Sequence, residues 1–314
     1  MTGRPVLSKH MTAVEGAAVT GTDRIAYYSY SLDASVDVPG QEDIFTVDPA
    51  TGDVQRLTDD SRSLDFISDR NPVWSPDRGV LAIHRSVSDQ LPHLCVVDAR
   101  TGETRADLGE GHTPVWLDDD VLLHSSTERY HVVVATRVST GEQRQVLVLP
   151  EGCDVEGMSW HDGAGLAFGY ADETPWWRIG CLPADVVRAA VDGGEPAPAD
   201  GVILYGRPGV SLALPDWDPR GERLCVSQMV PSGDPSQARV VILDPRAGTY
   251  VEVPRGDDDL TDIDGSWSPD GQSIVYVRSH GVEWSELWLY DVAAGTTRQL
   301  TDDNRLRAKG SPDW

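Results

Sequence analysis

The chain has 314 residues and is strongly acidic, with 51 Asp and Glu against 26 Lys and Arg, so its formal net charge is −25. This charge disfavours nucleic acid and anionic membranes as partners, because phosphate binding requires basic patches. No stretch approaches the length of a transmembrane helix. Residues 1–21 are polar and lack the apolar run of a signal peptide, so we expect a flexible N-terminal tail there and a single domain over residues 22–314.

The cysteines and the basic residues indicate the kind of cell in which the chain works. Four cysteines stand far apart without paired spacing: Cys95, Cys153, Cys181 and Cys225. This pattern argues against a zinc site and favours a reducing, cytoplasmic location. Only Lys9 and Lys309 are lysines, so Arg supplies nearly all of the positive charge. We interpret this bias as the mark of a GC-rich bacterial genome or of a salt-adapted proteome.

Short hydrophobic segments with strand character follow one another along the whole chain. The first three cover residues 25–28, 44–47 and 54–57, with no Trp before them. After these segments, five Trp residues each precede a hydrophobic strand, and a sixth is the last residue of the sequence. The six motif residues are Trp74, Trp116, Trp160, Trp217, Trp267 and Trp314. Their spacing of 42 to 57 residues, with about four strands in each interval, is typical of a β-propeller blade.

The turns between the expected strands have their own sequence pattern. Residues 75–77 read Ser-Pro-Asp and residues 268–271 read Ser-Pro-Asp-Gly, which suits a type I turn closed by a left-handed glycine. A second turn recurs as Asp-x-x-x-Gly at residues 48–52, 98–102 and 291–295. Short strands joined by such turns predict an all-β fold.

The two ends of the chain complement each other. Residues 25–28 are a second strand that lacks a first, and residues 312–314 are a first strand that lacks a second. Together they make one blade, so we expect a six-bladed β-propeller in which the first and last strands pair to close the ring. Such closure removes exposed strand edges.

These motifs resemble the TolB-type propeller repeat over roughly residues 24–314. TolB itself resembles a secreted protein with an additional N-terminal α/β domain, and neither feature is recognisable here. The repeat is also similar to the propeller of the prolyl oligopeptidase family, but no hydrolase domain follows it. The resemblance therefore implies a free-standing TolB-like propeller and specifies no chemistry.

Blade four departs from the repeat. Residues 176–182 read as its third strand, residues 183–191 as a short helix, and residues 195–199 as a stiff Pro-rich linker to a fourth strand at 202–204. This insertion lies between the third and fourth strands, so we expect it on the outer rim, away from the axis. Trp176 and Trp177 adjoin a loop on the opposite face, where they either pack against the blade or offer a stacking surface.

Strand order predicts where a ligand would bind. The loops that enter the first strand and leave the second share one face of the ring, and they are long and irregular at residues 30–41, 59–70, 228–237 and 256–264. The short turns occupy the other face. Because function concentrates on variable loops held by a rigid scaffold, we expect the site in the central funnel on the loop face.

The candidate residues come from two positions of the repeat. Residues three and four before each Trp contribute Arg70, Asn71, His112, Glu156 and Asp264, with Asp262 one step further out. The ends of the second strands contribute His84, His124, Tyr170, Gln228, Arg278 and His280. All of these are candidate ligand-binding residues. His112 and Glu156 are also candidate catalytic residues, because a His beside a carboxylate can act as a general base.

Two functions remain open on the sequence. One is a binding protein that holds a small molecule, a peptide or a protein partner on the loop face. The other is an enzyme of lyase, cyclase or hydrolase type that acts on a polar small molecule. In the second case His and carboxylate side chains would act either by acid–base chemistry or together with a divalent cation that they hold in the central funnel.

Overall fold

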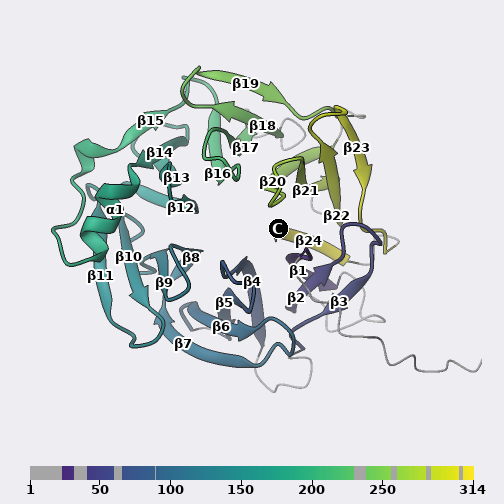
Figure 1. Cartoon of the computed structure of the whole chain (residues 1–314), viewed down its shortest axis with the longest axis horizontal. Helices are drawn as coiled ribbons and strands as arrows, with labels where there is room; N and C mark the ends of the chain where they lie inside the picture. The colour runs from purple at the N-terminus through teal and green to yellow at the C-terminus, as the bar shows by residue number, and fades with distance from the viewer. Residues whose placement is uncertain are drawn as a thin grey trace, which may run out of the picture.

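The computed structural model describes residues 23–31, 41–59, 66–88, 90–229, 238–255, 260–280, 284–303 and 307–314. Over these ranges the chain forms six antiparallel sheets of four strands, arranged around a central axis as the blades of a propeller (Figure 1). The predicted all-β, six-bladed fold is confirmed. The tail expected at residues 1–21 lies outside the described residues, as does part of each irregular loop.

In five blades the strands run outward from the axis in chain order, and in blade one the last strand of the chain stands innermost, before the first three. The motif Trp stands at or beside the end of the innermost strand. Blade one consists of β24 (Arg307–Asp313), β1 (Ile25–Ser31), β2 (Glu42–Val47) and β3 (Val54–Arg56). Blade two consists of β4 (Ile67–Trp74), β5 (Val80–Val87), β6 (His93–Asp98) and β7 (Thr104–Glu110). Blade three consists of β8 (His112–Trp116), β9 (Val121–Ser125), β10 (Val132–Arg137) and β11 (Gln143–Val148).

The remaining three blades follow the same order. Blade four consists of β12 (Asp154–His161), β13 (Gly165–Ala171), β14 (Arg178–Leu182) and β15 (Ile203–Tyr205), with α1 (Ala184–Val191) and a short 3-10 helix (Ala199–Gly201) between its last two strands. Blade five consists of β16 (Ser211–Trp217), β17 (Leu224–Met229), β18 (Arg239–Asp244) and β19 (Thr249–Glu252). Blade six consists of β20 (Thr261–Trp267), β21 (Ser273–His280), β22 (Trp284–Asp291) and β23 (Thr296–Gln299).

Blade one contains both ends of the described chain, which closes the ring as predicted. β24 pairs antiparallel with β1, with Asp313 opposite Ala26 and Gly310 opposite Tyr28. A side chain at Gly310 would meet the Tyr28 ring, because a Cβ there would lie 2.4 Å from the phenol. The absence of a side chain at Gly310 therefore allows the last strand to pack against the first.

The hydrophobic core is divided among the interfaces between blades. Trp267 is 3% exposed and packs between Val240 of blade five and Ile274 of blade six. Trp74 packs in the same way between Ile44 of blade one and Leu81 of blade two. The motif tryptophans are thus structural, as expected, although Trp160 and Trp314 are only partly buried. Each of the six core clusters in the described ranges joins residues of two neighbouring blades.

The turns have the conformations that the sequence predicted. The Ser75 hydroxyl accepts a hydrogen bond from the Val80 amide at 3.1 Å, and the Ser268 hydroxyl accepts one from the Ser273 amide at 2.9 Å. Gly271, at the end of its turn, has a φ of 68°. That left-handed conformation is easily adopted by glycine.

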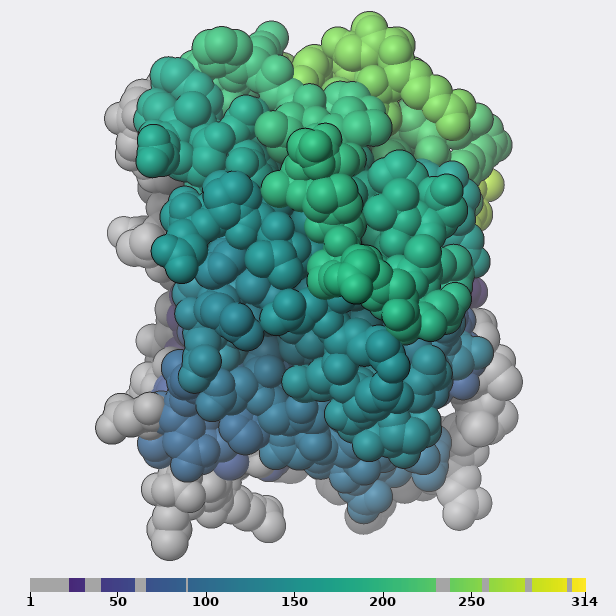
Figure 2. All heavy atoms as spheres, turned by 90° about the vertical axis from the view of Figure 1, so that its left-hand side faces the viewer, coloured from purple at the N-terminus to yellow at the C-terminus, as the bar shows by residue number. Residues whose placement is uncertain are grey.

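The insertion in blade four forms the helix predicted for it. Val187, Ala190 and Val191 of α1 pack against the core shared by blades three and four, so the helix lies on the outer rim (Figure 1). Seen from that side, the molecular surface over residues of blades three and four is continuous (Figure 2). No helix in the described ranges is long and apolar enough to cross a membrane. All four cysteines are buried free thiols.

Candidate functional site

A cavity of about 260 Å³ lies at the centre of the ring, and all six inner strands line it. We call this cavity the channel and divide it into three levels by distance from the motif Trp. The mouth holds the residues three and four before the Trp, and the base holds the residue directly before it. Between them lies a collar of mostly apolar residues: Pro72, Pro114, Met158, Pro215, Gly265 and Pro312.

Every inner strand bulges at the mouth. The third residue before each Trp has a positive φ of 43° to 61° in all six blades: Asn71, Thr113, Gly157, Leu214, Asp264 and Ser311. The pairing register with the second strand shifts at or next to this position. A left-handed conformation costs roughly 1–3 kcal/mol at a non-glycine residue, and a bulge re-aims the side chains beside it. Five non-glycine residues therefore carry backbone strain around one ring.

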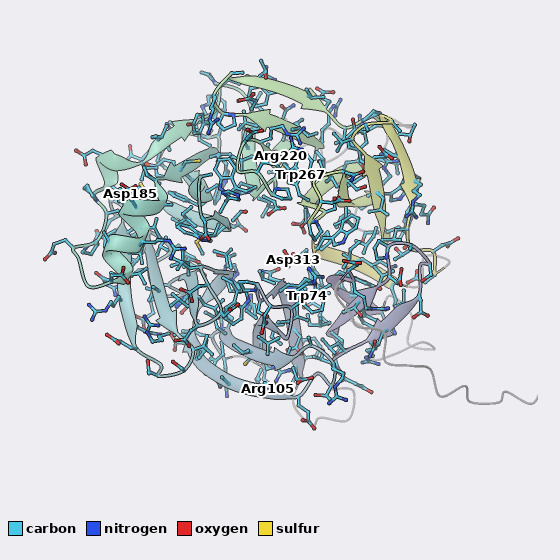
Figure 3. All side chains as sticks on the ribbon, in the orientation of Figure 1. Trp74, Arg105, Asp185, Arg220, Trp267 and Asp313 are labelled. Atoms are coloured by element: carbon cyan, nitrogen blue, oxygen red, sulfur yellow. The ribbon has the colours of Figure 1, made fainter. Side chains whose placement is uncertain are left out.

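Side chains at the base connect adjacent blades. The Asp313 carboxylate accepts the Trp74 amide of the next blade at 2.8 Å, and the Asp216 carboxylate accepts the Trp267 amide at 2.7 Å. Ser159 and Ser266 accept the corresponding amides of Trp217 and Trp314. Blades two and three have Val73 and Val115 at this position. A valine side chain cannot accept a hydrogen bond, so these two blades lack this contact to the next blade. Figure 3 shows Asp313 and Trp74 next to the axis and Arg105 and Asp185 on the outer rim.

Three aspartates of the channel have pKa values far above the usual range. Burial raises the pKa of Asp216 to about 7, and the charge of Asp313 contributes to the shift. Burial also raises the pKa of Asp313 to about 6. At the mouth, burial raises the pKa of Asp264 to about 6, with a contribution from Glu156. These carboxylates are poorly solvated and close to other acidic groups, so a nearby positive charge would stabilise their ionised form.

The mouth also contains His112 and Glu156, the candidate catalytic pair. Burial and the nearby Arg70 lower the pKa of His112, which favours the neutral imidazole. Burial and the charge of Asp154 raise the pKa of Glu156. The His112 ring packs edge-on against His84 at 4.7 Å and Tyr130 at 6.3 Å. No hydrogen bond joins His112 to Glu156 in the structure, so the geometry of a general-base dyad is not in place between these two residues.

The same residues do not form a metal site in the structure. In the part of the chain that the structure describes, no group of three or more His, Cys, Asp or Glu side chains is arranged to hold a metal ion. The divalent cation in the funnel therefore stays a prediction from the sequence.

Comparisons with known proteins identify the architecture. The solved structure of TolB from Acinetobacter baumannii superposes with a TM-score of 0.67 at 19% identity, covering 93% of this chain and 66% of that one. An oligogalacturonate lyase in complex with manganese gives 0.54 at 16% identity, covering 88% of this chain and 72% of that one. A puromycin-hydrolyzing peptidase from Mycobacterium tuberculosis gives 0.53 at 15% identity, covering 82% and 41%. The fold is that of the TolB-like β-propellers.

Two further comparisons complete this picture. Residues 233–314 match the family model of the dipeptidyl peptidase IV N-terminal region. A search of curated proteins finds no significant match. The neighbours of this TolB-like propeller include TolB and enzymes, so the shared fold leaves binding and catalysis unresolved.

Several predicted site residues of the TolB-like propeller lie beside the channel in ion pairs of their own. Asp262 and Arg278 form a two-pronged salt bridge with both distances at 2.7 Å, and their side chains are 1% and 3% exposed. Arg278 also stacks on Trp288 at 4.4 Å. Arg70 pairs with the buried Glu42. The charges of these residues are already compensated within the protein. Asp262 and Arg278 lie behind the channel wall, and Arg70 stands at the level of the mouth without lining the cavity.

The histidines at the ends of the second strands are also buried behind the channel wall. His124 is 2% exposed and bonds to the Thr136 hydroxyl at 2.8 Å, while burial lowers its pKa to about 4. Burial lowers the pKa of His84 to about 3, with a contribution from His112. Both rings are therefore neutral at pH 7. The side chain of His280, the last residue of β21, lies outside what the structure describes.

The last two predicted residues also lie away from the channel lining. The Tyr170 ring packs against Arg178 at 5.0 Å, and its hydroxyl lies 3.4 Å from the Cys153 thiol. Gln228 is buried in β17. The structure thus gathers Asn71, His112, Glu156 and Asp264 around the channel.

Asp216 and Asp313 at the base were not among the site residues predicted from the sequence. Their visible pattern was Pro-Asp directly before a motif Trp, in two blades only.

Proposed function

We propose that this protein binds a small positively charged molecule in the channel. The observation that supports this most strongly is the composition of the channel wall. Four carboxylates line it, from Glu156, Asp216, Asp264 and Asp313, and among the described residues no Arg or Lys lines it. A cation placed among crowded carboxylates relieves their mutual repulsion and lowers their raised pKa values.

The rest of the molecule favours the same class of ligand. A net charge of −25 attracts cations to the surface and raises the rate at which they reach the mouth. The channel, at about 260 Å³, is slightly smaller than the ~300–1,000 Å³ range of pockets for drug-sized ligands. A small molecule fits this space better than a folded partner.

Thermal unfolding with matched ligands tests the proposal. Butylammonium and guanidinium ions should raise the melting temperature at millimolar concentration, because a ligand that binds only the folded state stabilises it. Butyrate, which has a similar stem and the opposite charge, should not. In the Glu156→Gln/Asp264→Asn variant the stabilisation by cations should disappear. The control Glu103→Gln removes an exposed carboxylate from a turn on the outer rim and should respond like the wild type.

Equal shifts with butylammonium and butyrate, or full cation binding by the double variant, would contradict the proposal. If instead His112→Ala alone abolished binding, a role for the imidazole in place of the carboxylates would follow.

A further inference from the structure

We propose that the ligand of the channel is a linear aliphatic diamine or polyamine. One ammonium group binds at the mouth, the methylene stem passes through the collar, and a second ammonium group binds at the base. This inference rests on the proposed function, because it assumes that the channel selects cations. Beyond the proposed function, it specifies that the ligand carries at least two positive charges and that an aliphatic segment separates them.

Hydrogen bonds place the carboxylates at two separate depths. Asp264 accepts the amide of Ser311, three residues before a motif Trp, at 2.6 Å. Asp216 and Asp313 accept the amides of motif tryptophans themselves. The amide that Asp264 binds lies three residues before a motif Trp, and the amides that Asp216 and Asp313 bind belong to motif Trp residues. A strand rises ~3.3 Å per residue, and the bulge shortens the path between the two levels. The two depths are therefore roughly 7–10 Å apart along the channel.

Each depth carries two carboxylates from different blades. Glu156 of β12 and Asp264 of β20 stand at the mouth, and their charges interact. Asp216 of β16 and Asp313 of β24 stand at the base and line the same cavity, and the charge of Asp313 contributes to the raised pKa of Asp216. Two carboxylates that face one space form a cradle for an ammonium group, which can donate hydrogen bonds to both.

One acceptor at the base is unused. The Asp313 carboxylate accepts the Trp74 amide through one oxygen, and its other oxygen has no hydrogen-bond partner in the described ranges although the residue lines the channel. The guanidinium of Arg78 is close enough to lower the pKa of Asp313, but it lies over the Trp74 ring at 4.4 Å and does not line the channel. Asp313 therefore has one carboxylate oxygen left to accept a hydrogen bond from an ammonium group bound in the channel.

The collar between the two depths suits a hydrocarbon stem. Four prolines and Met158 contribute most of its wall. Proline has no backbone N–H, so this wall offers few hydrogen-bond donors. A stem of methylene groups gains from burial there, at about 0.8 kcal/mol per CH₂, whereas a hydroxylated stem would lose its hydrogen bonds to water.

Calorimetric titration with amines of one homologous series tests the inference. The full-length protein is titrated with butylamine, putrescine, cadaverine, hexamethylenediamine and spermidine at one pH and salt concentration. We expect the best diamine to bind about tenfold to a hundredfold more tightly than butylamine, because it adds one charge-assisted contact. Affinity should pass through an optimum with stem length, since only one spacing matches both depths.

Substitution at the base separates the two ends. Asp313→Asn keeps an acceptor for the Trp74 amide and removes the charge. It should weaken the binding of the best diamine by about tenfold or more, and it should weaken butylamine, which can still bind at the mouth, by a much smaller factor. Asp216→Asn serves as a second variant if Asp313→Asn unfolds, and Glu103→Gln is the control for net charge.

The outcomes distinguish this inference from the proposed function. If butylamine and the diamines bind equally well and Asp313→Asn affects neither, the channel binds monocations and the diamine inference is wrong. If no amine binds, the proposed function fails together with it. Diamine affinity that rises with stem length without an optimum would also contradict a two-point fit.

Discussion

Aspartates of the inner strands occupy two kinds of environment, one with a basic partner and one without. Asp262 is neutralised by a two-pronged bond to Arg278 and lies behind the channel wall. Asp216 accepts an amide and two hydroxyl hydrogen bonds but has no basic partner among the groups that shift its pKa, and burial raises that pKa to about 7. The first environment stabilises a charge and the second penalises it. The two residues therefore differ in their predicted responses to mutation and pH.

Removal of Arg278 should destabilise the fold strongly. Arg278→Met leaves the buried Asp262 carboxylate without its partner, which typically costs about 3–5 kcal/mol. Urea denaturation measures the loss. The exposed pair of Arg144 and Glu142 is the control, and Arg144→Met should cost less than about 1 kcal/mol. Equal effects of the two substitutions would show that the buried pair has no special role.

Asp216 should make the protein less stable as pH rises. Its pKa is 3.8 as a free group and about 7 in the folded protein, so the folded state binds this proton more tightly than the unfolded state. The resulting stability is fully present below pH 3.8 and is lost as pH rises to 7. Asp216→Asn removes this loss while its side-chain oxygen can still accept the Trp267 amide.

The difference in unfolding free energy between the wild type and Asp216→Asn isolates the effect of Asp216, because the other titrating groups are the same in both proteins. Asp216→Asn should lie close to the wild type near pH 4 and exceed it by about 4 kcal/mol at pH 8, because a shift of one pKa unit corresponds to about 1.4 kcal/mol. Chemical denaturation over this range gives both curves. A wild type that gains stability relative to the variant as pH rises would reverse the sign and refute the assignment.

At the scale of elements, the inner strands and the helix α1 have separate structural roles. The inner strands bulge at the mouth and carry the channel, while α1 only covers the outer rim of blades three and four. The helix is amphipathic, and its buried side consists of Val187, Ala190 and Val191. Changes in α1 should therefore affect stability without affecting the channel.

Val187 provides the test of that separation. Val187→Ala removes two methyl groups from a fully buried site and should cost about 1–3 kcal/mol. The control Asp185→Ala, on the exposed side of α1, should change stability by roughly 0.5 kcal/mol or less. Melting curves with and without putrescine measure both properties. A loss of amine-dependent stabilisation in Val187→Ala would mean that the rim and the channel are coupled.

The sequence predicted the elements well because the repeat constrains them at every level. The Trp spacing, the Ser-Pro-Asp-Gly turn and the helix of blade four all depend on local residue patterns. The channel was harder to predict, because its carboxylates interact across blades that are far apart in the chain. Asp262 and Asp264 are two residues apart, yet the bulge at Asp264 places it in the channel and leaves Asp262 behind the wall. No periodicity argument resolves that difference.

For the whole molecule, ring closure joins the two ends of the described chain. β24 is the innermost strand of blade one, and it contributes Ser311, Pro312 and Asp313 to the channel. Its packing against β1, β4 and β22 therefore stabilises the ring and completes the site. Stability and ligand binding should both depend on this strand.

A circular permutant tests that dependence. Deletion of residues 307–314 should abolish cooperative unfolding, because it exposes the edge of β1 and removes the partner of Trp74. A permutant that places residues 307–314 directly before β1 through a short Gly-Ser turn restores the same strand order. It should unfold cooperatively and bind amines like the wild type. A deletion variant with an unchanged melting transition would contradict closure by β24.

The most direct test of a cation site in the channel is a crystal structure of the protein grown with putrescine. We predict continuous density through the collar, with one end within hydrogen-bond distance of Glu156 and Asp264 and the other beside Asp216 and Asp313. Density for the amine at another surface, with only water in the channel under saturating ligand, would contradict the account.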